Sequence, residues 1–453
     1  NCRGDVILDE FNKPLYLIGC VNEIGKRQKA DNISGLLREP SLEEYVSSKS
    51  NNITGYFMQI GIDDFDEING RFGLKCGDEI LKQFSMCMQS CINENQKIYE
   101  LGNGRFIIMD LANHSKEDIL ELYDELKKSV EVALEENVYR VVYTISVGIV
   151  EIDKEMKDYD TLIKYSDFAL NEAKKKGKNS CYFFTQDKYK QFIRRREIRV
   201  ELQNAVDHNF KNFDVYYQPI IDIHTRNLIG AEALMRFKMK RNEQIEFISP
   251  AEFIPILEES GLIIPAGRWI LRQAVACCKK WQEFIPEFKV NVNLSYVQII
   301  KSKILDEIKQ ALKDFNLKPA LLGIEVTESG YLENTYHYKK LWSSLKEEGI
   351  TLILDDYGTG YSNAYRLSDL TPHYIKIDRV LTQKALSSNY ERSILIYIIE
   401  MAHSLKLNVC IEGVETEEEL QEIKKLNPDY IQGYLFGKPT PEDEFYNRQI
   451  KKK

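Results

Sequence analysis

The sequence predicts an α/β protein whose larger part is a TIM-like (β/α)8 barrel, preceded by a smaller α/β sheet domain. Beyond about residue 207, short apolar strands alternate with amphipathic helices over roughly 250 residues, a repeat typical of such barrels. Between residues 29 and 186, strand-like runs also alternate with helical periodicity. The length of 453 residues allows two or three domains, at about 150 residues each.

Composition narrows the class of protein. Hydrophobic residues make up 43% and charged residues 29%, which favours packed globular cores over disorder. The net charge of −9 disfavours binding to nucleic acid polymers. Nine cysteines without a CxxC pair indicate a reducing, cytoplasmic setting rather than a disulfide or zinc framework. No run approaches the ~18 apolar residues of a membrane helix, although an upstream segment could anchor the full-length protein.

The N-terminal stretch, residues 1–28, predicts a β-hairpin. Two apolar runs, Val6–Leu8 and Leu15–Val21, flank a turn signal at Asn12-Lys13-Pro14. This stretch resembles the last strands of a PAS sensor domain, so we interpret it as the C-terminal remnant of a PAS-like domain. The alternative is an ordinary N-terminal extension.

Residues 29–186 predict the smaller sheet domain, and residues 187–206 predict a connecting helix. The expected strands of the domain are 55–62, 106–109 and 143–149, and the expected helices are 119–134 and 162–173. The connecting helix carries Arg194-Arg195-Arg196 and Arg199. A basic run this short is more typical of a solvated helix face than of a nucleic-acid site.

The region 207–453 contains eight candidate barrel strands. They are Val215–Ile221, Leu228–Leu234, Lys289–Leu294, Leu322–Val326, Thr351–Leu354, Tyr374–Ile377, Asn408–Ile411 and Tyr430–Leu435. Because barrels of this type carry their active sites at the carboxyl ends of the strands, polar residues at those ends are the candidates for chemistry.

Polar side chains close or interrupt these apolar strands. They are Glu232, Asn293, Glu325, Glu328, Asp355, Asp356, Lys376, Glu412 and Gln432. Any one of them could be a surface ion pair, but a converging set of buried acids requires a cation to offset its charge. Oxygen ligands suit Mg²⁺ or Mn²⁺ better than zinc. Two such ions ~3.5–4 Å apart can activate a water for in-line displacement at phosphorus.

Residues 207–445 resemble the EAL domain family, metal-dependent phosphodiesterases that hydrolyse cyclic di-GMP to linear pGpG in bacterial second-messenger signalling. The resemblance lies in an ordered set of motifs: Tyr217-Gln218-Pro219-Ile220, Glu232-Ala233-Leu234 with Arg236, Phe253-Ile254-Pro255, Asn293, Glu325-Val326-Thr327-Glu328, Asp355 to Ser362, Lys376, Glu412 to Glu415, and Gln432-Gly433-Tyr434. Three departures from the family pattern, at Phe237, Tyr357 and Asn363-Ala364, remove no ligand.

The resemblance implies two divalent metal ions, Mg²⁺ or Mn²⁺. Glu232, Asn293, Glu325 and Asp355 would hold the first ion, and Asp355 would bridge to a second ion near Asp356. Ca²⁺ is expected to occupy the same oxygen ligands and inhibit, because its coordination is longer and looser.

The resemblance also assigns catalytic roles. Glu412 would position or deprotonate the attacking water, and Lys376 would orient that water and offset developing charge. Gln432 would support the water shell of the second ion. The loop from Asp356 matches the one that couples homodimerisation of the EAL domain to metal binding, and Glu328 matches the residue that steadies it.

Substrate contacts follow from the same resemblance. Gln218, Leu234, Arg236 and Gln432 would bind cyclic di-GMP, and an Arg suits phosphate because its guanidinium donates two hydrogen bonds. The alternative is a non-catalytic cyclic di-GMP receptor that uses the same pocket. Retention of the acids and the lysine favours the hydrolase.

The middle domain resembles a GGDEF diguanylate cyclase from Asp31 to Asn179. Its signature reads Gly102-Asn103-Gly104-Arg105-Phe106. The family has metal-binding acids where Gly104 and Arg105 stand, and its other metal-binding Asp falls on Gly61. We therefore predict a degenerate domain without cyclase activity.

At other positions of the nucleotide site, this sequence matches the family pattern. Asn69 and Asp78 stand where the family binds guanine, and Lys174 and Lys178 stand where it contacts the triphosphate. The hypothesis is that the domain binds GTP without turnover and regulates hydrolysis. The alternative is a decayed scaffold kept for folding or dimerisation.

Overall fold

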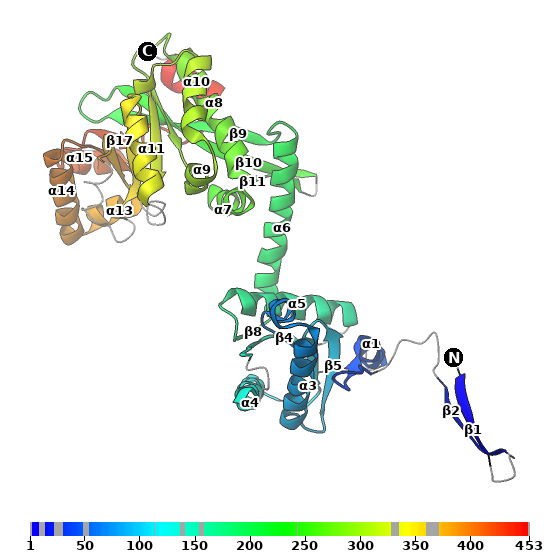
Figure 1. Ribbon diagram of the computed structural model, residues 1–453. Helices are drawn as coiled ribbons and strands as arrows, with labels where there is room; N and C mark the ends of the chain where they lie inside the picture. Colours follow the sequence, from blue (N-terminus) through cyan, green and yellow to red (C-terminus); the bar gives the residue numbers. More distant parts are fainter. Residues whose placement is uncertain are drawn as a thin grey trace. The chain divides into compact units, whose positions relative to one another are not determined.

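The computed structural model of the protein describes residues 2–8, 14–21, 30–48, 54–112, 114–135, 141–153, 158–241, 243–327, 335–358 and 371–451. The chain divides into two compact units, Asn1–Phe192 and Ile193–Lys453 (Figure 1). Each unit is described by itself below. Within the described residues, no helix is both long enough and apolar enough to span a membrane.

The first unit begins with the expected β-hairpin. Strands β1 (Cys2–Leu8) and β2 (Pro14–Val21) pair antiparallel and form a two-stranded sheet of their own. The hairpin predicted from the turn signal is confirmed. Its likeness to a PAS domain stays a prediction.

The rest of the first unit is a six-stranded sheet with the order β3-β5-β6-β4-β7-β8. Its strands are β3 (Leu37–Arg38), β4 (Gly55–Ile62), β5 (Gln96–Gly102), β6 (Arg105–Asp110), β7 (Ile145–Ile152) and β8 (Cys181–Phe183). Its helices are α1 (Glu39–Ser48), α2 (Phe65–Phe72), α3 (Leu74–Cys91), α4 (Lys116–Glu135) and α5 (Tyr159–Lys175). The sequence predicted β4, β6, β7, α4 and α5 but not the other elements.

Successive side chains of each strand alternate between the two faces of this sheet, and each face has its own hydrophobic core. On β4, Met58 packs into the core that includes residues of α3 and α4, while neighbouring Phe57 packs into the core that includes residues of α1 and α5. Successive side chains of a strand point to opposite faces, so a sheet covered on both sides needs apolar residues in continuous runs. The strand at 55–62 satisfies this requirement and lies in the middle of the sheet.

Helix α6 (Gln186–Asp207) occupies the place of the predicted connecting helix. Its second half is part of the second unit, where Ile198, Leu202 and Ala205 are buried at helical spacing. Arg194 of the basic run pairs with Glu246 at 2.8 Å and hydrogen-bonds Glu252 at 3.0 Å. Ion pairs with neighbouring acids support the interpretation of this basic run as a helix face rather than a nucleic-acid site.

The second unit contains the predicted barrel. Eight strands close into a ring in the order β9-β10-β12-β13-β14-β15-β16-β17, and β17 pairs again with β9. They are β9 (Phe213–Asp222), β10 (Leu228–Arg241), β12 (Lys289–Asn293), β13 (Leu322–Thr327), β14 (Thr351–Tyr357), β15 (Tyr374–Ile377), β16 (Asn408–Glu412) and β17 (Tyr430–Gln432). The remaining strands, β11 (Gln244–Ile248) and β18 (Thr440–Pro441), extend it at the edge.

Strand β9 departs from a strict β/α repeat because it runs antiparallel to both β10 and β17. The link to β10 is only residues 223–227, whereas a parallel crossover needs about a dozen residues. The chain therefore turns back as a hairpin. Asp222 holds the turn, since its Oδ1 accepts hydrogen bonds from the backbone N–H groups of His224 at 3.0 Å and Thr225 at 2.7 Å.

Helices surround the barrel and bury its outer surface (Figure 1). They are α7 (Pro250–Ser260), α8 (Ile263–Trp281), α9 (Tyr296–Lys301), α10 (Ile304–Asp314), α11 (Thr335–Glu347), α13 (Arg379–Ser387), α14 (Asn389–Ser404), α15 (Glu417–Lys424) and α16 (Glu442–Phe445). Cys277 and Cys278 are buried on α8, as expected for packing residues. This frame places the carboxyl ends of the seven parallel strands at one mouth of the barrel.

Candidate functional site

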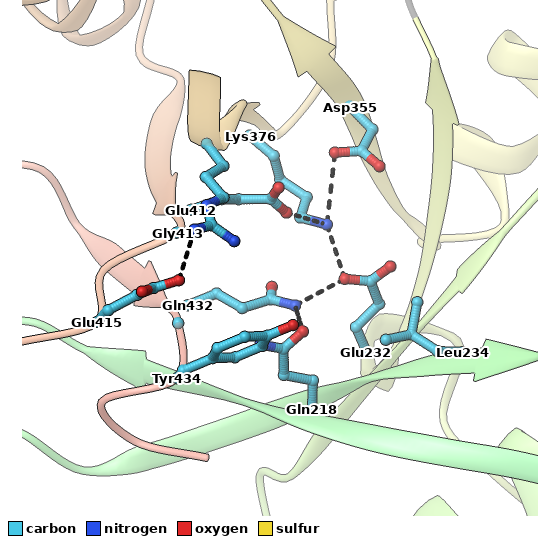
Figure 2. A pocket seen from close by; sticks show the side chains of 12 residues that line it. Gln218, Glu232, Leu234, Asp355, Lys376, Glu412, Gly413, Glu415, Gln432 and Tyr434 are labelled. Carbon is cyan, nitrogen blue, oxygen red and sulfur yellow. Dashed lines mark hydrogen bonds and ion pairs between the residues drawn. The ribbon is translucent and has the colours of Figure 1, made fainter. Parts of the chain in front are cut away.

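A cavity of about 260 Å³ opens at the carboxyl ends of the barrel strands (Figure 2). Polar and charged side chains dominate its wall. The lining residues are Gln218, Glu232, Leu234, Asp355, Lys376, Arg379, Glu412, Gly413, Glu415, Gln432, Gly433 and Tyr434. They come from β9, β10, β14, β15, β16 and β17 and from the segments that follow these strands.

Strand register explains why these side chains meet. Glu232 on β10 lies opposite Gln218 on β9, and Glu412 on β16 lies opposite Gln432 on β17. Residues that are paired in register on neighbouring strands point to the same side of the sheet, which here is the interior of the barrel. Residues far apart in the sequence therefore converge at one mouth.

The ammonium of Lys376 occupies the centre of the site. Its Nζ lies 2.7 Å from Glu412 and 2.9 Å from Glu232. The carboxylates of Glu325 and Asp355 lie 3.0 Å and 3.4 Å away. Lys376 is 1% exposed, so it is a fully buried cation surrounded by acids. Figure 2 shows its contacts with Glu232, Asp355 and Glu412.

Two amide side chains hold Glu232 at both of its oxygens. Asn293 Nδ2 donates to Glu232 Oε1 at 2.7 Å, and Gln432 Nε2 donates to Glu232 Oε2 at 2.8 Å. The same Gln432 nitrogen donates to Gln218 Oε1 at 3.0 Å. These bonds fix the orientation of the Glu232 carboxylate within the site.

Three of the buried carboxylates could hold a metal ion. Glu232, Glu325 and Asp355 each offer an oxygen, and these atoms lie within 4.8 Å of one another. Within the described residues, the buried Asp355 Oδ1 accepts no hydrogen bond, and its contact with Lys376 is a long ion pair of 3.4 Å. An all-oxygen ligand set fits a hard divalent cation. The residues therefore fit a Mg²⁺ or Mn²⁺ ion.

The pKa values of the buried groups reflect the crowding of negative charge in the site. Burial raises the pKa of Glu412 to about 8, against the opposing effect of Lys376. Burial and the neighbouring Glu232 raise the pKa of Glu325 well above its usual range, and burial also raises the pKa of Asp355. Burial alone would lower the pKa of Lys376, but the surrounding carboxylates raise it well above its usual range. The lysine stays charged and lowers the pKa of Glu232 despite the burial of that acid, whereas Glu325, Asp355 and Glu412 favour a proton or a cation.

A second, larger cavity of about 650 Å³ adjoins the first, and Leu234 lines both. Its wall is mainly apolar and includes Ile254 and Ile270, with Arg236, Glu258 and Asn293 as polar members. Arg236 donates to the backbone oxygen of Met235 at 3.0 Å, and its guanidinium lies over the ring of Tyr216, 5.5 Å from the centroid. A charged cavity thus borders an apolar one.

Asp356, another expected site residue, is not among the residues that line either cavity. Asp356 is half-buried on β14 with a φ of 57°, and the lining includes Asp355 rather than Asp356. Burial and then Asp355 and Asp378 raise the pKa of Asp356 to about 6. Glu328 and the loop after Gly358 lie outside the described residues.

In the first unit, cations stand where the GGDEF resemblance expects a metal site. Gly61 on β4 is opposite Arg105 on β6, and Lys174 Nζ lies 3.2 Å from the position that a Cβ on Gly61 would take. Arg105 pairs with Asp167 at 3.5 Å. Among the described residues of this unit, no three potential ligands come close enough to hold a metal ion.

The four expected GTP contacts differ in their environment. Lys178 pairs with Asp64 at 2.6 Å, and Asp78 is exposed on α3. Asn69 is half-buried, and within the described residues its buried Oδ1 has no hydrogen-bond partner. The structure brings Lys174 next to the Gly61 position, as described above.

Sequence reasoning missed several residues around the barrel site. Arg379 and Glu415 pair at 2.7 Å across the cavity wall, and Tyr434 lines it (Figure 2). Asn291 and Tyr374 contact each other beneath Glu325. A signal for Asn291 was present, because it lies two residues before Asn293 in an apolar strand, and period-2 alternation places both on the same face.

Comparisons with known proteins agree with these features. The family model for the EAL domain matches residues 199–439, and the model for the diguanylate cyclase GGDEF domain matches residues 29–180. The signaling protein YkoW of Bacillus subtilis is 31% identical over 87% of this chain and 48% of its own length. The cyclic di-GMP phosphodiesterase PdeR of Escherichia coli is 28% identical over 93% of this chain and 64% of its own length. The chain thus spans only about half to two thirds of these relatives.

Solved structures align with just over half of the chain. The PaMucR phosphodiesterase, in complex with c-di-GMP, aligns with a TM-score of 0.52 and 29% identity, covering 55% of this chain and 99% of its own. The EAL enzyme Bd1971 in its cAMP-bound form aligns with a TM-score of 0.53 and 26% identity, covering 58% of this chain and 72% of its own.

Proposed function

Because the chain belongs to the EAL domain family and carries a GGDEF domain ahead of its EAL domain, we propose that it hydrolyses cyclic di-GMP to linear pGpG. The observation that carries the proposal is the buried arrangement of Glu232, Glu325, Asp355 and Glu412 around Lys376. Relatives named as cyclic di-GMP phosphodiesterases support the choice of substrate.

The proposed metal ligands are Glu232, Asn293, Glu325 and Asp355, with Asp356 near a second ion. A bound Mg²⁺ or Mn²⁺ would supply a water of lowered pKa and would offset negative charge on the phosphoryl oxygens. Two ions and their identity are part of the proposal, as is inhibition by Ca²⁺. The strands hold oxygens of Glu232, Glu325 and Asp355 within 4.8 Å of one another, a spacing that suits ligands of one ion.

Glu412 is the proposed general base. The water oxygen bonds to phosphorus while Glu412 accepts a proton of that water. The bond between phosphorus and the 3′-oxygen breaks, the 3′-oxygen takes a proton from solvent to give a 3′-hydroxyl, and Glu412 returns its proton to solvent, which leaves a 5′-phosphate. Glu412 lines the same cavity as Glu232 and Asp355, which places its carboxylate within reach of a water bound there. Lys376, 2.7 Å away, orients the carboxylate and stabilises its charge.

The two adjoining cavities suit a ligand whose charged phosphates link flat aromatic bases. The phosphate to be cleaved would lie in the acidic cavity, and a base would enter the apolar cavity beyond Leu234. Arg236 lines the second cavity, and its guanidinium would donate to a phosphate oxygen. Gln218 and Gln432 would complete the contacts from β9 and β17.

A cyclic di-GMP receptor without catalysis is the second candidate. It would need the pocket but not the buried lysine and acids, whose burial is costly to folding. Incubation of the chain with cyclic di-GMP and Mg²⁺, followed by chromatography, separates the two. Release of pGpG supports the hydrolase, whereas bound ligand without product supports the receptor.

We further propose that the GGDEF domain makes no cyclic di-GMP. Gly61, Gly104 and Arg105 supply no metal ligand, and Lys174 adds positive charge next to Gly61. Binding of GTP at Asn69, Asp78, Lys174 and Lys178 is the proposed remaining role, with an effect on hydrolysis. Calorimetric titration tests it: no heat at millimolar GTP and no change in hydrolysis rate would reject regulation and favour a scaffold.

Homodimerisation through the EAL domain completes the proposal. Sedimentation of the full chain with and without Mg²⁺ tests it, because the loop after Asp356 is proposed to couple dimerisation to metal binding. A dimer that strengthens with Mg²⁺ is expected, and a monomer at all concentrations would reject it.

A further inference from the structure

Asn291 is a buried amide in the interior of the barrel. It lies on β12, is 2% exposed, and has Gly323 on β13 opposite it in the strand register. A Cβ added to Gly323 would come within 2.2 Å of Asn291 Oδ1. The barrel therefore leaves space for the Asn291 side chain by having glycine at its neighbour.

Both hydrogens of the Asn291 amide have acceptors. Nδ2 donates to Glu325 Oε1 at 2.8 Å and to Tyr374 Oη at 2.5 Å. Because an amide nitrogen carries two hydrogens, these two bonds use its full donor capacity and fix its orientation. The other oxygen of Glu325 accepts from Lys376 at 3.0 Å. Glu325 is thus held from two sides.

Tyr374, which accepts one of these hydrogen bonds, is itself held by packing. It packs with Ile220, Ile353 and Cys410 in an apolar cluster separate from the main core. Its ring also lies 5.8 Å from the ring of Tyr430 in an edge-to-face arrangement. A small cavity of about 150 Å³, lined by both tyrosines and Asn291, lies at this end of the barrel. The phenol is therefore a rigid acceptor for Asn291.

We infer that Asn291, held by Tyr374, is a positioning residue that orients the Glu325 carboxylate for a divalent cation. This inference rests on the metal site of the proposed function. Outer groups that hydrogen-bond a ligand carboxylate typically change metal affinity by about 10–100-fold when removed. Without the Asn291 bond, Glu325 would keep only its contact with Lys376, and the remaining ordering by the cation would weaken binding.

The test measures Mn²⁺ affinity of the full chain by calorimetry. In Asn291→Ala we expect the dissociation constant to rise about 10-fold or more. In Tyr374→Phe, which keeps the ring packing, we expect a smaller rise. The control Ile353→Val removes a methyl group from the same apolar cluster, so it should lower stability and leave Mn²⁺ affinity unchanged.

A kinetic readout separates positioning from a structural role. If Asn291 acts through metal binding, the kcat of Asn291→Ala recovers at saturating Mn²⁺, while the Mn²⁺ concentration for half-maximal rate rises. Unchanged Mn²⁺ affinity in Asn291→Ala overturns the inference. If that variant does not fold, unchanged affinity in Tyr374→Phe overturns it instead. A wild-type chain that binds no Mn²⁺ rejects the metal site itself, which distinguishes failure of the proposed function from failure of this inference.

Discussion

The Nζ of Lys376 lies 2.7 Å from Glu412 Oε1, at the point where β15 and β16 end side by side. Three further carboxylates lie within 3.4 Å of the same nitrogen. One buried lysine therefore holds four acids together, and the chemistry of the site depends on what else neutralises them. The predictions below follow from this relationship.

Substitution Lys376→Met should destabilise the barrel in the absence of metal. Removing one partner of a buried ion pair typically costs about 3–5 kcal/mol because the remaining charge is uncompensated. All three tryptophans of the chain, Trp269, Trp281 and Trp342, lie in the second unit, so urea unfolding followed by tryptophan fluorescence reports on the barrel. We expect a lower urea midpoint and no release of pGpG.

The matched control is Lys280→Met. Lys280 pairs with Glu442 at 2.8 Å, but its side chain is 66% exposed. Exposed pairs contribute about 0–1 kcal/mol, so this variant should unfold near the wild-type midpoint. Equal effects of the two substitutions would contradict the role given to the buried lysine.

Substitution Glu232→Ala should abolish turnover because it removes a proposed metal ligand that also accepts bonds from Asn293, Gln432 and Lys376. Release of pGpG measured by chromatography checks it. Arg105→Ala, in the first unit, should leave the rate unchanged. A fully active Glu232→Ala enzyme would refute the assignment.

Substitution Glu412→Gln should separate binding from chemistry. Glutamine keeps the size of the side chain but cannot accept the proton of the attacking water. We expect kcat to fall about 10²–10⁴-fold, while affinity for cyclic di-GMP changes little. Glu422→Gln, at an exposed ion pair with Arg392 and Lys425, is the control. A Glu412→Gln enzyme with wild-type kcat would rule out the general-base role.

Stability of the metal-free barrel should fall as pH rises. Glu412 titrates at about 8 and Asp356 at about 6 in the folded chain, above the unfolded values of about 4.3 and 3.9. The folded state therefore binds more protons than the unfolded state, and this contribution to stability is complete at low pH and is lost as pH rises through these pKa values. Urea midpoints in EDTA, compared at about pH 5 and about pH 8, measure it.

Mg²⁺ should reverse most of that loss, because the cation replaces the protons that crowded carboxylates otherwise keep. Stabilisation by Mg²⁺ should thus be larger at about pH 8 than at about pH 5. A midpoint in EDTA that rises with pH, or a Mg²⁺ effect that is equal at both values, would contradict this interpretation.

The sequence predicted the barrel and most of its mouth. Acids such as Glu232 and Asp355 interrupt apolar strands, where a charge is costly without a function or partner, so their positions were informative. The antiparallel β9 was not predicted. A signal for its direction was present, because the predicted strands 215–221 and 228–234 leave only residues 222–227 between them, too few for a parallel crossover.

Other parts of the site depend on contacts that a linear pattern does not encode. The space for Asn291 comes from Gly323 on the next strand, and its acceptor Tyr374 comes from a strand farther along. Arg379 and Glu415 meet only because the ends of β15 and β16 are adjacent. Pairing between elements distant in sequence is set by tertiary packing, so single residues of this kind carry little signal.

The most direct test of the account is hydrolysis in water enriched in ¹⁸O. The full chain is incubated with cyclic di-GMP and Mg²⁺, and the product is examined by mass spectrometry. We predict pGpG with one heavy oxygen in its 5′-phosphate, formed with Mg²⁺ and absent with EDTA. Cyclic di-GMP recovered intact from a folded, Mg²⁺-saturated chain would contradict the central claim that these converging acids hold a cation for attack on phosphorus.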